Sequence, residues 1–172
     1  PEFVDVHALD ENLDVNALIA LAAAAETAAE GNAIARAVRI FAEHHAIAPE
    51  SVRRAVFLPG RGVTALSPGG EPFVIGNRQL LLDEGVSVAL AEAEAARAEA
   101  RAHTALFVGL GGRVRAVVAL QDAVRPGARA AVQRIFDLQV EAVLVSGDHR
   151  GTVEALARNL DVTHVKAELL PE

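Results

Sequence analysis

The pattern of apolar residues in this 172-residue chain changes near residue 120, and the change restricts the chain to two joined architectures. Before it, short apolar runs separated by glycine and proline predict antiparallel strands. After it, strand-like and helical segments alternate, which is the order found in parallel sheets. We therefore expect an α+β domain, an antiparallel sheet flanked by helices, over residues 1–119. Residues 120–172 are expected to form an incomplete α/β, Rossmann-like segment.

Two helices and a meander are expected within the first part. A β-like entry at residues 3–6 precedes an Ala- and Leu-rich helix at 13–29, and a second helix follows at 33–45. Between these helices, Glu30-Gly31-Asn32 interrupts the helical spacing. The later elements are expected as strands 55–58, 63–66 and 72–75, a short helix to Asp83, a long helix from a Ser87 cap to about Arg101, and a hairpin of 104–110 and 113–120.

After residue 120 the expected elements are a helix that starts at Pro126, a buried strand at 142–145, a helix that ends at Leu160 and a strand at 164–166. The loop after the buried strand carries the hydroxyl of Ser146 and the carboxylate of Asp148. Open α/β sheets bind ligands at this carboxyl-terminal edge of their strands. Asp148 is also a candidate N-cap for the helix that begins near Arg150.

Composition excludes several classes of function. The net charge of -7, with Lys166 as the single lysine, argues against sequence-independent binding of nucleic acid, which needs a basic surface. Without cysteine the chain can form neither disulfides nor thiolate metal sites. His44 and His45 are neighbours on a helix and do not share the face that an i, i+4 pair would, so we predict no metal site. Every apolar run is interrupted by charge before the roughly 18 residues that a membrane span requires.

Three short motifs carry a family resemblance: Gly60-Arg61-Gly62, Val74-Ile75-Gly76-Asn77-Arg78 and Ser146-Gly147-Asp148. In this order, and with the segment from Asp161 to Glu172, they resemble the P-type cation-transporting ATPases, nearest to the heavy-metal-transporting branch. In that family a nucleotide-binding domain is inserted into a phosphorylation domain of haloacid dehalogenase type. The resemblance implies the same two parts here.

The resemblance also implies site residues. Glu30, Gly60, Gly62, Gly76 and Asn77 would surround ATP, and Ser146 and Asp148 would lie near the transferred phosphate, with Ser146 in the place of the family's threonine. Glycine lets a backbone approach a nucleotide closely and adopt a positive φ.

Several of these positions have structural alternatives. The GxG is also an ordinary turn, Asn77 a helix cap, and Glu30-Gly31-Asn32 a helix end. Gly31 and Asn32 replace a His-Pro pair whose histidine holds adenine in the family, so we expect weakened or differently placed ATP binding.

The complete protein implied by the resemblance would transfer the γ-phosphoryl of Mg-ATP to an aspartate and thereby drive cation transport. That aspartate lies in an Asp-Lys-Thr-Gly sequence, which this chain lacks, so the chain alone is expected to be inactive. Its partners would be ATP and the remaining phosphorylation, actuator and membrane domains, at the cytoplasmic face of a membrane. Two alternatives stay open: a degenerate pump-related domain with a regulatory or interaction role, and a fragment of a haloacid dehalogenase-type phosphatase.

Half of a phosphorylation domain would leave a sheet edge and an apolar face uncovered. We therefore expect residues 120–172 to dock on the first domain or to associate with another molecule.

Overall fold

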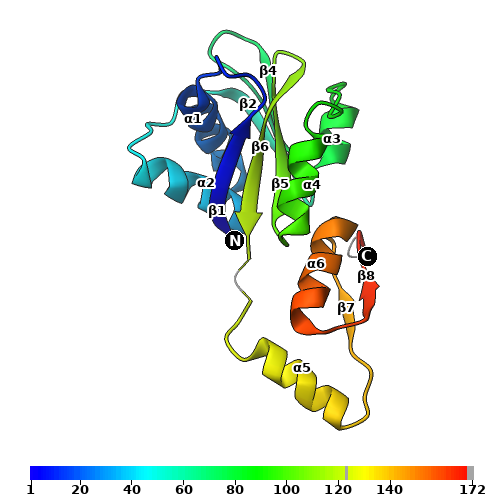
Figure 1. Ribbon diagram of the computed structural model, residues 1–172. Coiled ribbons are helices and arrows are strands. Elements are labelled where there is room, and N and C mark those ends of the chain that lie inside the picture. The colour runs from blue at the N-terminus through cyan, green and yellow to red at the C-terminus, as the bar shows by residue number, and fades with distance from the viewer. Residues whose placement is uncertain (123, 170–172) are drawn as a thin grey trace.

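The computed structural model describes residues 1–122 and 124–169, so the last three residues of the segment that carries the resemblance lie outside it. Figure 1 shows two units joined by one connection. The first unit runs from β1 to β6 and contains an antiparallel sheet with helices on both faces. The second runs from α5 to β8 and contains a parallel strand pair. The expected fold class, an α+β unit followed by a partial α/β unit, is confirmed.

The sheet of the first unit has the strand order β1-β6-β5-β4-β3-β2, with every neighbouring pair antiparallel. Its strands are β1 (Glu2–Ala8), β2 (Arg53–Leu58), β3 (Gly62–Leu66), β4 (Pro72–Gly76), β5 (Thr104–Leu110) and β6 (Arg113–Gln121). The meander β2–β3–β4 and the hairpin β5–β6 match the elements expected from the glycine-separated apolar runs. The N-terminal strand β1 pairs with β6, so the first and last strands of this sheet along the chain are neighbours.

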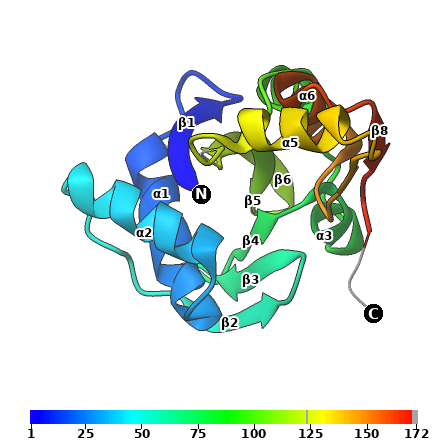
Figure 2. The same cartoon turned by 90° about the horizontal axis from the view of Figure 1, so that it is seen from below.

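Helices cover the two faces of this sheet, because alternate residues of its central strands point to opposite sides. α1 (Val15–Ala25), the 3₁₀ turn η1 (Glu26–Ala29) and α2 (Ala33–His44) pack on the face that carries Ile75 and Leu106. α3 (Arg78–Asp83) and α4 (Glu92–Ala100) pack on the other face, with Val74 and Phe107. Figure 2 shows α1 and α2 on one side of the strands and α3 on the other.

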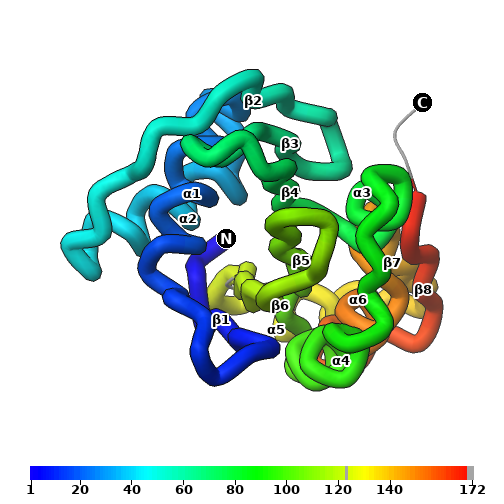
Figure 3. Tube along the Cα trace, turned by 90° about the horizontal axis from the view of Figure 1, so that it is seen from above, coloured from blue at the N-terminus to red at the C-terminus, as the bar shows by residue number. Residues whose placement is uncertain are grey.

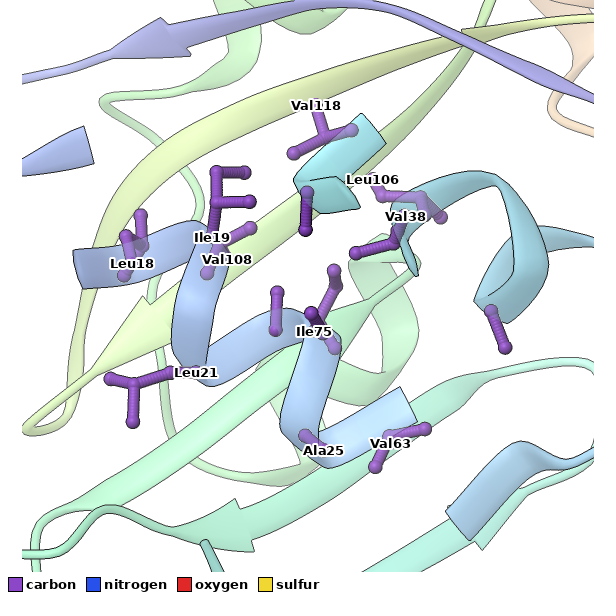
Figure 4. Close-up of a cluster of buried hydrophobic side chains, with 14 of the residues drawn as sticks. Leu18, Ile19, Leu21, Ala25, Val38, Val63, Ile75, Leu106, Val108 and Val118 are labelled. Carbon is purple, nitrogen blue, oxygen red and sulfur yellow. The ribbon is translucent and has the colours of Figure 1, made fainter. Parts of the chain in front are cut away.

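Small side chains let α1 approach the sheet closely. Ala22, Ala23 and Ala25 are completely buried, and Figure 4 shows Ile19 and Val38 from the helices beside sheet residues such as Val118. Alanine loses no side-chain entropy when it is buried, whereas each aliphatic side chain gains about 1.5–3 kcal/mol by leaving water. The alanine-rich composition therefore builds a thin, closely packed helix layer.

The second unit follows the βαβ order expected from its sequence, but its first strand is not buried as expected, since Val143 and Val145 are exposed. It contains α5 (Ala128–Asp137), β7 (Val143–Val145), α6 (Arg150–Leu160) and β8 (His164–Lys166), and β7 pairs with β8 in parallel. α6 packs against α4 of the first unit, and Figure 3 shows α6 beside α4 from above. α5 has no buried residue and lies apart from the first unit in Figure 1.

Two expected helix starts are wrong, whereas α6 begins at Arg150 as expected but has a different cap from the candidate Asp148. α4 begins at Glu92 rather than after a cap at Ser87, because residues 89–91 form a turn, closed by the bond from the Ala91 N–H to the Val88 carbonyl (2.8 Å). α5 begins at Ala128 rather than at Pro126, because Gly127 adopts φ +85°, which a right-handed helix cannot include. The N-cap of α6 is His149, and not Asp148.

Candidate functional site

A cavity of about 740 Å³ lies where the two units meet. The first unit contributes the β2–β3 turn, the end of β4 and the start of α3, and the second contributes the loop after β7. Its apolar wall includes Ile34, Phe57, Ile75 and Leu106, and its polar rim includes Glu26, Asn32, Arg61, Asn77, Arg78, Gln79, Asp148, His149, Thr152 and Glu168.

Gly60, Gly62 and Gly76 all line this cavity, and the fold itself explains why each is glycine. A Cβ on Gly62 would stand 2.1 Å from the Ile75 carbonyl oxygen, and one on Gly76 would stand 2.3 Å from that of Arg61. β3 and β4 therefore approach more closely than any larger residue allows. Gly60 differs, since a Cβ there would meet open space, and only its φ of +71° favours glycine.

Asn77 is the N-cap of α3. Its Oδ1 accepts a hydrogen bond from the Leu80 N–H (3.0 Å), and its Nδ2 donates to the Gly60 carbonyl (3.1 Å). One side chain thus starts the helix and fixes the turn that contains Gly60. The capping role that the sequence offered as an alternative is present. The bond to Gly60 also links the two glycine-containing motifs.

Glu30 is exposed and is not among the residues that line the cavity. It follows η1, Gly31 adopts φ +86°, and Asn32 caps α2 by accepting hydrogen bonds from the N–H groups of Ile34 (2.8 Å) and Ala35 (3.3 Å). The segment therefore has the helix-end geometry that was the alternative to a nucleotide contact, although Asn32 also lines the cavity.

Glu26 is a cavity residue that sequence reasoning missed. It is only 3% exposed, and this burial raises the pKa of its carboxyl to about 7, although the nearby Arg39 acts in the opposite direction. The sequence did contain a signal, since Glu26 is the only charged residue in the apolar stretch from Ala17 to Ala29. A carboxyl group that is uncharged near neutral pH can donate as well as accept a hydrogen bond.

Ser146 and Asp148 are bonded to each other at the end of β7. The Ser146 hydroxyl donates to Oδ2 of Asp148 (3.2 Å) and accepts from the Asp148 N–H (3.1 Å). Asp148 lines the cavity together with Gly147, whereas Ser146 stands one residue further back. The loop is thus brought to the same cavity as the two glycine motifs, although Gly62 and Gly76 precede Gly147 by about 85 and about 70 residues in sequence.

Arg78 is the second cavity residue that was not singled out from the sequence. Its Nε and Nη2 donate to Glu92 and its Nη1 donates to Glu99 (2.6 Å), with the guanidinium over the Phe107 ring. Burial acts to lower the pKa of Arg78, but the hydrogen bonds to Glu92 and Glu99 outweigh it and raise the pKa. Arg78 is therefore a permanent cation at the cavity wall.

Within the described ranges, 1–122 and 124–169, no three His, Asp or Glu side chains are grouped so that they could hold a metal ion. Across the same part of the chain, every helix is too short or too polar to cross a membrane.

The fold defines a class: an α+β unit with an antiparallel sheet, joined to an α/β unit of βαβ order. The family model described as "haloacid dehalogenase-like hydrolase" matches residues 5–172, and the chain belongs to that family.

Two curated relatives are copper pumps by name. The chain is 29% identical over 154 residues to the copper-exporting P-type ATPase of Staphylococcus haemolyticus, covering 90% of this chain and 19% of that protein. It is 34% identical over 173 residues to the probable copper-exporting P-type ATPase of Archaeoglobus fulgidus, covering 99% of this chain and 20% of that protein. The chain thus spans about a fifth of the length of the curated relatives it matches.

Solved structures give the same result. A zinc-transporting PIB-type ATPase in its E2.Pi state superposes with a TM-score of 0.63 at 25% identity, over 98% of this chain and 26% of that one. The catalytic domain of the CPx-ATPase CopB-B superposes with a TM-score of 0.68 at 15% identity, over 98% of this chain and 55% of that one. The resemblance to the cytosolic catalytic region of heavy-metal P-type ATPases is confirmed.

Proposed function

We propose that this chain binds ATP in the 740 Å³ cavity and presents it for phosphorylation of an aspartate, as part of a heavy-metal-transporting P-type ATPase. One observation carries the proposal: the glycine motifs of the first unit and the Asp148 loop of the second line the same cavity. A cavity of 300–1,000 Å³ with an apolar wall and a few polar groups is typical of small-molecule sites.

The apolar wall suits the faces of a purine, and the polar rim suits its edge. Ile34, Phe57 and Leu106 offer aliphatic and aromatic surface, while Glu26 offers a carboxyl that can donate to a ring nitrogen. The Gly60 turn is open because no side chain projects from it. We place the adenosine here, and the phosphates toward the loop of Ser146 and Asp148.

Mg²⁺ fits this chain only as a companion of the nucleotide. The described residues lack a cluster of ligands that would hold the ion by themselves. Mg²⁺ in phosphoryl-transfer sites is typically bound by substrate phosphates with one or two carboxylates, and it neutralises the charge of the phosphates. Asp148 and Glu168 add negative charge to the cavity, so we expect nucleotide to bind more tightly with Mg²⁺ than without it.

We also propose the context of the chain. Residues 1–119 would be the nucleotide-binding domain and 120–172 part of a phosphorylation domain, at the cytoplasmic face of a membrane-embedded parent. Its partners would be the other phosphorylation, actuator and membrane domains. Because no Asp-Lys-Thr-Gly sequence is present, the chain alone would bind ATP without turning it over.

A titration of the ¹⁵N-labelled chain with a non-hydrolysable ATP analogue, compared with the matching GTP analogue, tests the proposal. We expect saturable amide shifts at Glu26, Gly60 and Asn77 that are larger with the adenine nucleotide. Glu26→Ala, which removes both the donor and the acceptor, should weaken the preference for adenine, whereas Glu50→Ala, outside the cavity, should not. A folded spectrum without shifts at millimolar nucleotide would overturn it.

One alternative keeps a specific observation in its favour. Gly31 stands where the heavy-metal branch has histidine, so no ring is available there to stack on a base. A Cβ at this position would contact nothing within 4 Å, so packing does not explain the glycine. A pump-related domain with a regulatory or interaction role would explain this loss. Absence of shifts in the titration above would favour that alternative. A free-standing phosphatase is disfavoured, because relatives match the chain over its whole length, including the glycine motifs.

A further inference from the structure

The two units also meet at a polar contact whose carboxylate, Glu99, does not line the proposed nucleotide cavity. Glu99, on α4, lies within 3.1 Å of His149, the residue that caps α6. Thr152 strengthens the same junction, since its hydroxyl donates to the His103 carbonyl (2.9 Å). A Cβ on Gly151 would stand 3.4 Å from the Cβ of Glu99, so the first turn of α6 lies directly against that residue.

Glu99 is a buried carboxylate shared between the two units. It is 5% exposed, and its two oxygens have different partners: Oε1 accepts from Arg78 (2.6 Å), and Oε2 faces Nδ1 of His149. Arg78 belongs to the first unit and holds Glu99 in place whatever the second unit does. A buried carboxylate oxygen that loses its partner is costly, so Glu99 favours a positively charged group at the position of His149.

His149 has two mutually exclusive uses for the same nitrogen. Its Nδ1 lies 3.4 Å from the Gly151 N–H, which it can accept only when that nitrogen carries no proton. It lies 3.1 Å from Oε2 of Glu99, to which it can donate only when it does carry a proton. Its Nε2 lies 3.6 Å from Oε1 of Glu168. Both carboxylates are therefore satisfied together only by the doubly protonated imidazolium.

We propose that His149 and Glu99 form a proton-dependent latch that sets the position of the second unit against the first. With the imidazolium present, His149 bridges Glu99 and Glu168 and holds α6 against α4. The neutral imidazole carries one proton and can serve only one of the two carboxylates. With Nδ1 unprotonated, His149 caps α6 and loses the bond to Glu99, and this is the state in which the latch opens. Histidine is the side chain suited to such a change between about pH 5 and 8.

The other charged and titratable groups around His149 do not provide the same switch. They are Arg78 behind Glu99, His103 at the end of α4, Glu168 after β8, and Asp148 and Arg150 on either side of His149. Burial and the nearby Arg101 lower the pKa of His103, which disfavours its charged form. Glu168 is half exposed and therefore contributes less than Glu99.

The latch acts on the cavity through chain geometry. His149 directly follows Asp148, and both line the cavity opposite Gly60 and Asn77. A change in the seating of α6 therefore changes the gap between the glycine motifs and the Asp148 loop. The latch does not require a particular ligand in the cavity, so its test is independent of the test of nucleotide binding.

The absence of cysteine allows a direct measurement. Spin labels at Glu43→Cys on α2 and Asn159→Cys on α6, both exposed, report the distance between the units in the 172-residue chain. By pulsed electron–electron double resonance we expect one narrow distance distribution at pH 5.5 and a second population at a different distance at pH 8.5. The ratio of the two should change by about twofold to fivefold, as for a partly exposed ion pair.

His149→Asn should abolish this pH response, and His164→Asn, which removes an exposed histidine of the same unit, should leave it unchanged. In the unlabelled protein, imidazole ¹⁵N shifts should show His149 gaining a proton at Nδ1 over the same pH range as the distance change. The proposal is overturned if the distances do not depend on pH. It is equally overturned if His149→Asn keeps the response of the unsubstituted chain.

Discussion

At the scale of single residues, Glu26 makes stability depend on pH. Its pKa is raised by burial to about 7 in the fold, against an ordinary 4.5. The folded chain therefore retains a proton that the unfolded chain loses between these pH values. The stabilisation that comes from this retained proton is fully present below pH 4.5 and is lost as the pH rises through 7. We expect Glu26→Gln, which cannot ionise, to be more stable than the unsubstituted chain at pH 8 by on the order of 2 kcal/mol.

Urea unfolding at pH 5 and pH 8, followed by circular dichroism, checks this expectation. Glu30→Gln is the matched control, because it removes the same charge four positions along the chain from an exposed side chain. It should leave the difference in unfolding free energy between the two pH values unchanged. Equal pH dependence in Glu26→Gln and the unsubstituted chain would show that the carboxyl of Glu26 is ionised in the fold at pH 8 without cost.

The second prediction at this scale concerns Asn77, because its side chain makes two structural hydrogen bonds. Asn77→Ala removes the cap on the Leu80 N–H and the bond to the Gly60 carbonyl. Loss of an N-cap of this kind costs about 1 kcal/mol. We expect chemical denaturation to show at least that loss, and amide exchange to accelerate at the Gly60 turn. Asn16→Ala, an exposed substitution in α1, should change neither quantity.

At the scale of elements, the β3–β4 pair depends on glycine through close backbone contact. Gly62→Ala would place a methyl group 2.1 Å from the Ile75 carbonyl oxygen at φ +146°, so β3 and β4 would have to separate. Gly60→Ala would meet only the cost of a positive φ, about 1–2 kcal/mol. We therefore expect thermal unfolding to show a much larger loss for Gly62→Ala than for Gly60→Ala. Equal losses would mean that the strands absorb the added methyl group.

The elements also show where sequence reasoning succeeds. Strand and hairpin patterns are local, since alternation and a Gly-Gly turn act within a few residues, and β5 and β6 were expected almost to the residue. The βαβ order after residue 120 was predicted equally well. The start of α4 was predicted too early, because the Ala- and Glu-rich sequence up to residue 101 favours helix throughout. In the structure Ala91 is buried and ends a turn before the helix begins.

Site residues were less predictable than elements, because the cavity is assembled from distant segments. Gly60, Gly76, Asn77 and Asp148 were singled out from motifs and are brought together. Glu26 was missed, since its neighbours suggested only a buried helix and its exposure to the cavity depends on how α1 packs. Asp148 was a candidate cap of α6 from the sequence, but its carboxylate accepts a hydrogen bond from Ser146 and the cap is His149.

At the scale of the whole molecule, the second unit is only partly covered. α6 buries Val153 and Ala157, so this helix docks as expected, whereas α5 buries nothing. Its end and the strand that follows expose a set of aliphatic side chains: Ile135, Leu138, Val140, Val143 and Val145. Several exposed large apolar side chains within one short segment favour association with another surface.

We therefore predict that the chain associates with itself at high concentration through the surface formed by α5 and β7. Light scattering after size exclusion should show a mass that rises with concentration, and a Leu138→Glu, Val143→Glu double variant should stay monomeric. Leu90→Glu is the control, since Leu90 is the most exposed large apolar residue described and lies in the first unit. It should leave the association unchanged. A monomer at all concentrations, with rapid amide exchange throughout α5 and β7, would contradict the prediction and mean that these side chains stay in contact with water without driving association.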